Sequence, residues 1–204
     1  MSLTHRDLLT RILGAILLAL SLPLALGTAA LIWLDDGLPL FFTQMRVGKN
    51  GHPFRLIKFR TLTTNAQGTK TPSQHTIRTG SVLRRLALDE LPQLWNVVQG
   101  EMNLVGPRPV LPAEADGYDD WAVQRLTIRP GLTGWAQVCG RNEFDWRKRI
   151  EHDLWYVQHR DFLLDVWILA KTPFVLLVGR GVYGPGTDDP SPSEVRSHFQ
   201  RHRS

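Results

Sequence analysis

The sequence has a single cysteine, Cys139, among its 204 residues. One cysteine cannot form an internal disulfide, so we expect the globular part to stay in a reducing compartment. The seven histidines are scattered without the spacing of metal ligands, which argues against a structural zinc site. The chain also lacks internal repeats and any basic stripe interleaved with aromatic residues. These absences disfavour a repeat array and a nucleic-acid-binding protein.

The charge of the chain is positive overall. Lys and Arg number 24 against 19 Asp and Glu, so the formal net charge is +5. A basic balance of this kind favours anionic partners, such as phosphorylated substrates, anionic lipid or nucleic acid. The length is sufficient for one domain with a real core and hardly for two.

Charged residues are missing from the whole stretch between Ile12 and Leu34. As a straight helix this stretch measures about 35 Å, enough to cross the hydrocarbon core of a membrane. Three interpretations remain open on this pattern: a cleaved signal peptide, a transmembrane anchor, or a re-entrant helix divided at Pro23. Proline frees the carbonyl of Ala19, for which the Ser21 hydroxyl is a candidate partner. Basic residues on both flanks fit a segment that returns to its starting side better than a single crossing.

The rest of the chain predicts a mostly helical α+β domain. We expect a short strand within 53–62, a loop over 63–80, and helices over 113–127 and 143–159. Glycine and proline punctuate residues 100–112 and 129–141, which we expect to be irregular.

A second apolar stretch, residues 162–179, is interrupted by Asp165, Lys171 and Pro173. Charges at the centre of a bilayer are costly, so an interfacial helix or a buried core helix is expected rather than a second span.

Two adjacent carboxylates, Asp89 and Glu90, interrupt the apolar stretch "RRLALDELPQLW" at 84–95. One interpretation is structural: if a helix begins near Glu90, Asp89 is its N-cap and Pro92 lies in the first turn. The other is functional, because a helix N-terminus beside two arginines can bind phosphate. One carboxylate there can attack phosphorus while its neighbour holds a magnesium ion. Spacing alone leaves both interpretations open.

Five further cations stand in nearby motifs and are candidates for the same site. They are Lys58, Arg60, Arg108, Arg129 and Arg141.

Four motifs resemble, in order, those of the bacterial sugar transferases, the monotopic phosphoglycosyl transferases that start glycan assembly. The motifs are "KFRTL", "LRRLALDELPQLWNVVQGEMNLVGPRP", "RPGLTGWAQVCGR" and "DLWYVQHRDFLLDVWILAKT". The resemblance runs from about Ile12 to Tyr183. It implies that a UDP-sugar gives its sugar 1-phosphate to undecaprenyl phosphate and releases UMP.

The resemblance also implies roles for individual residues. Asp89 would be the nucleophile that forms a covalent aspartyl-phosphosugar intermediate, and Glu90 would help to hold the cofactor Mg²⁺. Lys58 and Arg84 would recognise phosphate or lipid phosphate, and Arg108 and Arg129 would contact phosphate or uridine. Arg60 and Arg141 stay substrate-binding candidates through their positive charge in these motifs. Asp153 matches an acidic position of the family whose role the resemblance leaves unassigned.

The same resemblance favours the re-entrant interpretation of the N-terminus. Family members carry a helix broken near a Ser-Pro pair and lie in the bacterial inner membrane, with the catalytic domain on the cytoplasmic face. Here Leu22 separates Ser21 from Pro23, and Cys139 replaces a common asparagine. The resemblance thus predicts a re-entrant membrane helix over 1–40 and a catalytic domain over 41–183. The composition of the remaining residues predicts a flexible tail over 184–204.

The expected partners follow from this reaction. They are a UDP-sugar, undecaprenyl phosphate, membrane lipids and downstream glycosyltransferases, with no nucleic acid, and a homodimer is compatible with the sequence. An alternative function is a non-catalytic membrane-surface protein that binds polyprenyl phosphate or nucleotide sugar. Neither the sugar nor the glycan pathway can be read from the residues.

Overall fold

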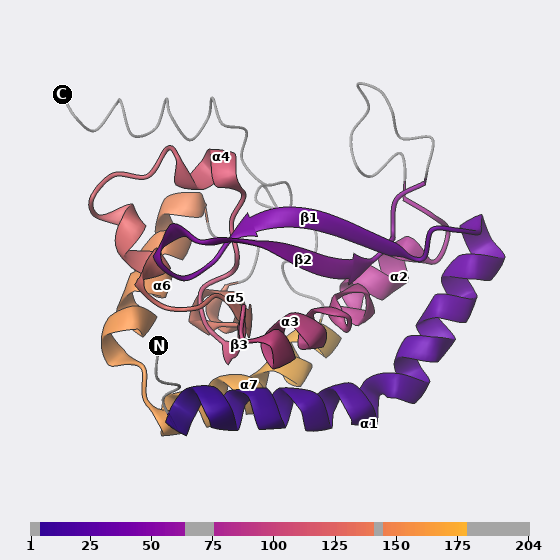
Figure 1. The fold of residues 1–204 in the computed structure, drawn as a ribbon, viewed down its shortest axis with the longest axis horizontal. Coiled ribbons are helices and arrows are strands. Elements are labelled where there is room, and N and C mark those ends of the chain that lie inside the picture. The colour runs from indigo at the N-terminus through magenta and orange to yellow at the C-terminus, as the bar shows by residue number, and fades with distance from the viewer. Residues whose placement is uncertain (1–4, 64–75, 141–144, 179–204) are drawn as a thin grey trace. The chain divides into compact units, whose positions relative to one another are not determined.

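A computed structural model describes residues 5–63, 76–140 and 145–178 (Figure 1). Contacts divide the chain into two compact units. The first unit comprises Met1–Gln44 and Leu56–Gln99, and the second comprises Met45–Arg55 and Gly100–Ser204. The described part is mostly helical with two small two-stranded sheets, which confirms the predicted α+β class. The predicted tail lies outside the described residues.

The N-terminal helix α1 (His5–Asp36) runs without interruption through Pro23. Figure 1 shows that it bends partway along its length, so the expected break between two separate helices is replaced by a bend. The Ser21 hydroxyl donates a hydrogen bond to the carbonyl of Leu18 at 3.1 Å, and not to the expected carbonyl of Ala19. A proline inside a helix removes one backbone donor, which is a sufficient cause of bending.

Helix α1 buries a few residues against protein and leaves most of its large aliphatic residues exposed. Gly14, Thr28 and Ile32 are buried, whereas Leu20 and Leu34 are 73% and 75% exposed. Large apolar side chains left in water would be unfavourable, so this outer surface suits lipid. Among the described residues, α1 is the one helix long and apolar enough to cross a membrane.

Helix α1 packs closely on α3 (Gln93–Gln99) within the first unit. A methyl group added at Gly14 would lie 2.8 Å from Cγ1 of Val97, which is closer than side-chain carbons normally approach. On the same face, Nε of Arg11 donates to the carbonyl of Val98 at 2.7 Å. A small residue therefore lets the two helices approach, and an arginine pairs with a carbonyl near the end of α3.

We expect Gly14→Ala to lower the free energy of unfolding by about 1–3 kcal/mol, because the added methyl overpacks the contact with Val97. Gly27→Ala is the matched control on the same helix, since nothing lies within 4 Å of its added methyl. There the change should be neutral or stabilising by up to about 1 kcal/mol through helix propensity. Thermal melting in detergent micelles measures both variants. Equal melting temperatures for the two would contradict the close packing of α1 on α3.

The first sheet is a hairpin of β1 (Phe41–Val47) and β2 (Pro53–Phe59), joined through the 3-10 turn η1 (Lys49–Gly51). Strand β2 confirms the strand expected within 53–62. In the first unit, the Phe41 and Phe59 rings stack with centroids 5.2 Å apart. The amide of Ile57 donates to Oδ1 of Asn96 at 3.2 Å, which ties this strand to α3.

The second sheet pairs β3 (Asn103–Val105) with β4 (Gly131–Thr133) in parallel, within the second unit. The backbones cross so tightly that a methyl added at Gly131 would lie 2.1 Å from the Gly106 nitrogen. These strands, and α5 (Trp135–Cys139), fall in segments expected to be irregular. Only these short pieces depart from the expectation. The two strands form because each gains backbone hydrogen bonds from a segment far along the chain, which local sequence pattern does not reveal.

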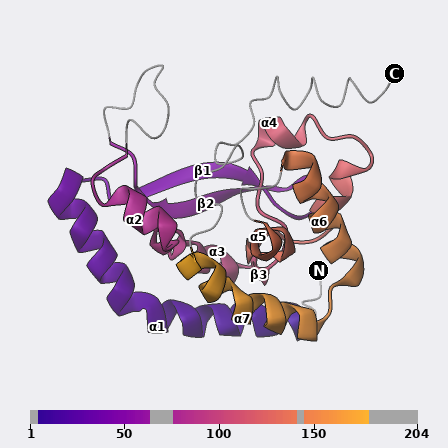
Figure 2. The same ribbon diagram turned by 180° about the vertical axis from the view of Figure 1, so that it is seen from behind.

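Four helical segments complete the second unit. They are α4 (Pro112–Ala115), η4 (Ala122–Thr127), α6 (Trp146–His159) and α7 (Phe162–Val178). The expected helix over 113–127 is thus two short pieces, whereas α6 agrees with the prediction. Figure 2 shows α5 in the corner between α6 and α7.

Helix α7 presents an exposed apolar surface rather than a buried one. Phe162, Leu163 and Leu177 are 63–76% exposed, and Ile168 is buried. Of the two expectations for this segment, the exposure fits the interfacial helix better than the core helix. Beside it, the rings of Trp135 and Trp155 stack with centroids 4.6 Å apart.

Candidate active site

The candidate site of the first unit is a turn between two short helices. Helix α2 (Gly80–Arg85) ends, and Ala87 then adopts a left-handed conformation with φ 54°. The 3-10 turn η3 (Leu88–Glu90) follows, and α3 begins only at Gln93. Asp89 therefore lies inside η3 and is not the N-cap of a helix starting at Glu90, which corrects the structural interpretation. A non-glycine residue at positive φ costs of order 1 kcal/mol, and such strain is often kept at functional sites.

Apolar neighbours hold this turn in the core of the first unit. Ile32 of α1, Phe59 of β2 and Leu83 of α2 form a buried cluster, and Leu88 and Leu91 pack against it. The leucines on either side of the two acids therefore supply the anchoring. Asp89 itself is 7% exposed, and Glu90 is half-buried. A buried carboxylate is costly to desolvate, so its place in this turn calls for a compensating role.

The end of strand β2 lies beside the same turn and brings basic and polar groups to it. Nε of Arg84 donates to Oγ1 of Thr61 at 2.8 Å, which joins the "KFRTL" motif to the end of α2. Lys58, three residues earlier, is half-buried. Sequence reasoning placed Lys58 and Arg84 among the candidates but missed Thr61. The place of Thr61 inside the motif "KFRTL" was the signal that could have identified it.

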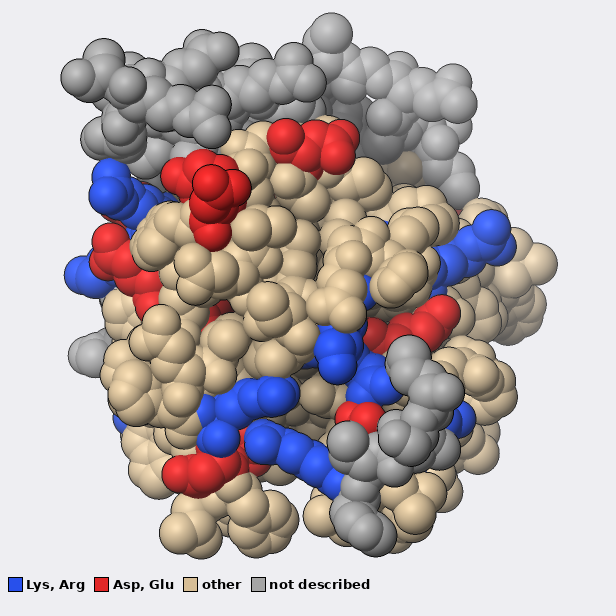
Figure 3. Space-filling model, turned by 60° about the vertical axis from the view of Figure 1, so that its left-hand side comes forward, with Lys and Arg blue, Asp and Glu red and all other residues tan. Residues whose placement is uncertain are grey.

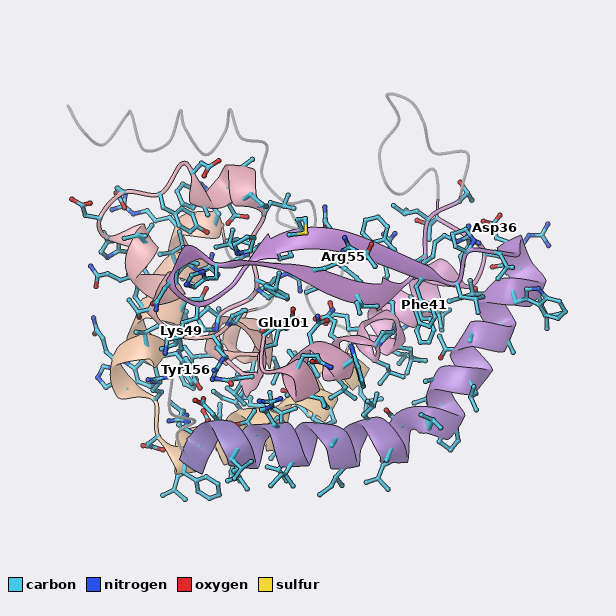
Figure 4. The ribbon with its side chains drawn as sticks, in the orientation of Figure 1. Asp36, Phe41, Lys49, Arg55, Glu101 and Tyr156 are labelled. Carbon is cyan, nitrogen blue, oxygen red and sulfur yellow. The ribbon has the colours of Figure 1, made fainter. Side chains whose placement is uncertain are left out.

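Arg60 is committed to the end of α1. Its guanidinium forms an ion pair with the Asp36 carboxylate and donates to the carbonyls of Pro39, at 2.6 Å, and Gly37, at 2.9 Å. Figure 4 labels Asp36 at this helix end and Phe41 at the start of β1. The Arg60 side chain is 7% exposed. Because these contacts hold the Arg60 guanidinium at the end of α1, we assign Arg60 a structural role and not a substrate contact.

The other acid at this helix end also joins two elements. Oδ2 of Asp35 accepts hydrogen bonds from the amide and the hydroxyl of Thr79, at 2.8 and 2.9 Å. Thr79 directly precedes α2, whose first amides have no partner within the helix. The last turn of α1 thus holds both the start of α2 and the end of β2.

The remaining predicted cations belong to the second unit. Arg108 follows β3 and is exposed, and Arg129 precedes β4 and is half-buried. Their segments run side by side, because the amide of Gly131 donates to the carbonyl of Pro107 at 2.9 Å. Arg141 lies outside the described residues. Cys139, at the end of α5, has an exposed thiol.

Asp153 takes part in a buried polar network of the second unit. Its carboxylate forms an ion pair with Arg125, whose Nη1 donates to the Tyr118 hydroxyl at 2.6 Å. Tyr118 donates in turn to Oε1 of Glu114 at 2.7 Å. Burial raises the pKa of the Tyr118 phenol, so it stays protonated and can donate. Burial also raises the pKa of Asp153, an effect that Arg125 opposes. Burial alone would lower the pKa of Arg125, but Tyr118 and the two carboxylates raise it. This network gives Asp153 a place in the fold.

Metal ligands are sparse in the described part of the chain, where no three His, Cys, Asp or Glu side chains gather closely enough for a metal ion. Mg²⁺ commonly binds through one or two carboxylates together with substrate phosphates, without an all-protein cage. The half-buried Glu90, next to Asp89, fits this kind of binding. On the face drawn in Figure 3, basic side chains lie beside acidic ones and broad areas carry no charge.

Comparison with known proteins places this chain in a family. A model of the bacterial sugar transferase family matches residues 2–179. The exopolysaccharide production protein ExoY of Sinorhizobium fredii is 40% identical over 197 residues, covering 87% of this chain and 86% of that protein. The chain therefore belongs to the bacterial sugar transferase family, as its motifs predict.

Two larger relatives carry names that specify a reaction. The UDP-N-acetylgalactosamine-undecaprenyl-phosphate N-acetylgalactosaminephosphotransferase of Aeromonas hydrophila is 41% identical over 170 residues, covering 78% of this chain. The UDP-glucose:undecaprenyl-phosphate glucose-1-phosphate transferase of Xanthomonas campestris pv. campestris is 38% identical over 188 residues, covering 85% of this chain. The matched region is 40% and 39% of these two proteins, respectively.

Proposed function

We propose that this enzyme transfers a sugar 1-phosphate from a UDP-sugar to undecaprenyl phosphate and releases UMP. Family membership and the reactions named for the relatives support the reaction class. The observation that carries the proposal to particular residues is the buried Asp89, set in a strained turn directly after α2. Arg84, at the end of α2, is bonded to Thr61 of the motif "KFRTL", which also contains Lys58. The sugar differs between the two named transferases, so the family alone does not choose the donor.

Asp89 is proposed as the nucleophile of a two-step reaction. One carboxylate oxygen forms a bond to the β-phosphorus of the donor, and the bond from that phosphorus to the bridging oxygen breaks. UMP leaves with the electron pair. A phosphate oxygen of undecaprenyl phosphate then attacks the same phosphorus, and the bond to Asp89 breaks, restoring the carboxylate. Burial favours this chemistry because a carboxylate with little bound water is a stronger nucleophile.

Neighbouring groups are proposed to bind the phosphates. Lys58 and Arg84 are proposed to supply positive charge for phosphate binding, and the Thr61 hydroxyl orients Arg84 through its 2.8 Å hydrogen bond. Arg108 and Arg129 of the second unit are proposed to bind the diphosphate of the donor. Glu90 would hold Mg²⁺, which when bound neutralises phosphate charge.

The membrane arrangement follows from the acceptor. Undecaprenyl phosphate keeps its phosphate at the depth of the lipid headgroups, so a nucleophile that meets it must lie at the membrane surface. We propose that α1 enters and leaves on the cytoplasmic side as a bent, re-entrant helix, and that the exposed apolar face of α7 rests in the interface. The bend within α1 and its outward leucines support this arrangement.

A panel of UDP-sugars tests the function directly. Purified full-length protein in lipid nanodiscs, with Mg²⁺ and undecaprenyl phosphate, should release UMP from at least one donor. Chelation with EDTA should stop the release, and added Mg²⁺ should restore it. No UMP from any donor, together with tight binding of undecaprenyl phosphate or UDP-sugar, would instead favour the non-catalytic alternative.

A further inference from the structure

Arg108 projects from a loop that is otherwise buried. From Leu104 to Val110 all residues are buried except Arg108, which is exposed. A long, charged side chain normally samples many rotamers, and ordering it on a ligand costs up to about 2 kcal/mol of side-chain entropy. A rigid backbone beneath such a side chain reduces the further freedom that binding must remove.

The backbone of this loop is held at four consecutive carbonyl oxygens, those of residues 107–110. Their donors are, in order, the Gly131 amide at 2.9 Å, Nη2 of Arg125 at 3.1 Å, Nη1 of Arg46 at 3.2 Å and the Val47 amide at 2.9 Å. The carbonyl of Arg108 itself is the one that Arg125 binds. The side chain of Arg125 therefore fixes the peptide unit that follows the Arg108 Cα.

Arg125 is in turn held from several sides. It is 5% exposed, its Nη1 donates to Tyr118 at 2.6 Å, and its Nη2 is paired with Asp153. Glu114 accepts from Tyr118 at 2.7 Å and lies 3.7 Å from Nη1 of Arg125. A guanidinium fixed by a phenol and two carboxylates is a rigid donor, since its planar fork has few ways to rotate.

We propose that Arg125 is a positioning residue that fixes the direction in which Arg108 meets the donor diphosphate. The inference rests on the proposed function, which gives Arg108 that contact. Asp153 and Tyr118 contribute to the same positioning, because they bind the Arg125 guanidinium, which in turn binds the Arg108 carbonyl. Positioning of this kind acts on catalysis without touching substrate, and small errors in it are costly.

A double-mutant cycle distinguishes positioning from a general structural role. In wild-type background, Arg125→Lys should lower kcat/KM for the donor by about tenfold, because lysine keeps the charge but loses the fork that binds the carbonyl. In the Arg108→Ala background the same change should cost less than about twofold, since nothing remains to be positioned. Arg147→Gln, an exposed position on α6, is the control and should behave alike in both backgrounds.

A milder pair keeps the test usable if Arg125→Lys does not fold. Tyr118→Phe removes one hydroxyl and no charge, and should lower donor kcat/KM by about threefold, with the loss vanishing in Arg108→Ala. Equal losses in both backgrounds overturn the inference and leave the proposed function standing. Absence of UMP release by the wild-type protein overturns both.

Discussion

Asp89→Asn should abolish UMP release, lowering kcat about a thousandfold or more, because an amide oxygen is a far weaker nucleophile than a carboxylate. The change preserves the size of the side chain, so the turn η3 and its leucine anchors should persist. Mass spectrometry of the intact wild-type protein, mixed with the donor but no undecaprenyl phosphate, should show one added sugar phosphate. The same measurement on Asp89→Asn should show none.

The matched control for this variant is Asp116→Asn, which makes the same chemical change at an exposed position after α4. It should retain wild-type turnover and form the adduct. If Asp89→Asn kept wild-type turnover, or if an adduct formed on another residue, the assignment of the nucleophile would be wrong. Saturation kinetics that require both substrates to be bound together would also exclude the two-step reaction.

Arg125→Met should lower the free energy of unfolding by about 3–5 kcal/mol. The change leaves two buried acids, Asp153 and Glu114, without the cation between them, and an uncompensated buried charge is among the costliest single defects. Denaturant unfolding of the protein in detergent micelles measures the loss. Adding Asp153→Asn to Arg125→Met should recover part of it, because the second change removes one stranded charge.

Arg147→Met is the comparison for that measurement. Its partner Glu151 lies 3.7 Å away on the same helix, and both side chains are about half exposed. Exposed ion pairs contribute about 0–1 kcal/mol, so this variant should unfold much like the wild type. Similar losses for Arg125→Met and Arg147→Met would show that burial of the Arg125 network adds no stability.

Local pattern was sufficient for the long elements of the fold. The uncharged run predicted α1, and the spacing of apolar residues predicted α6 and the strand β2. Local sequence pattern failed to predict elements whose hydrogen-bonding partners lie far away along the chain. β3 and β4 have three residues each, next to glycines and prolines, and become strands by pairing with each other across 28 positions, from Asn103 to Gly131. The proline at 23 bends α1 without breaking it, because the helix continues on both sides.

The sequence identified the residues proposed for the candidate site but gave little of their geometry. The residues Asp89, Lys58 and Arg84 stand in recognisable motifs, and the structure gathers their elements in the first unit. Arg60 belongs to an equally recognisable motif, but its buried contacts with Asp36 can be seen only in three dimensions. The positive φ of Ala87 had no signal either, since glycine is the usual residue there. The predicted boundaries at residues 40 and 183, the metal and the homodimer stay predictions.

The contacts that α1 makes with the rest of the first unit limit how this enzyme can be truncated and how it can evolve. Ile32 belongs to the apolar cluster on which the leucines around Asp89 pack. Asp35 binds Thr79, just before α2, and Asp36 pairs with Arg60, just after β2. Helix α1 is therefore a structural part of the first unit, which carries the candidate site, and is more than an interchangeable hydrophobic segment. Removing α1 to obtain a water-soluble fragment, or replacing it with an unrelated hydrophobic helix, would remove contacts that support the turn of Asp89, the proposed nucleophile.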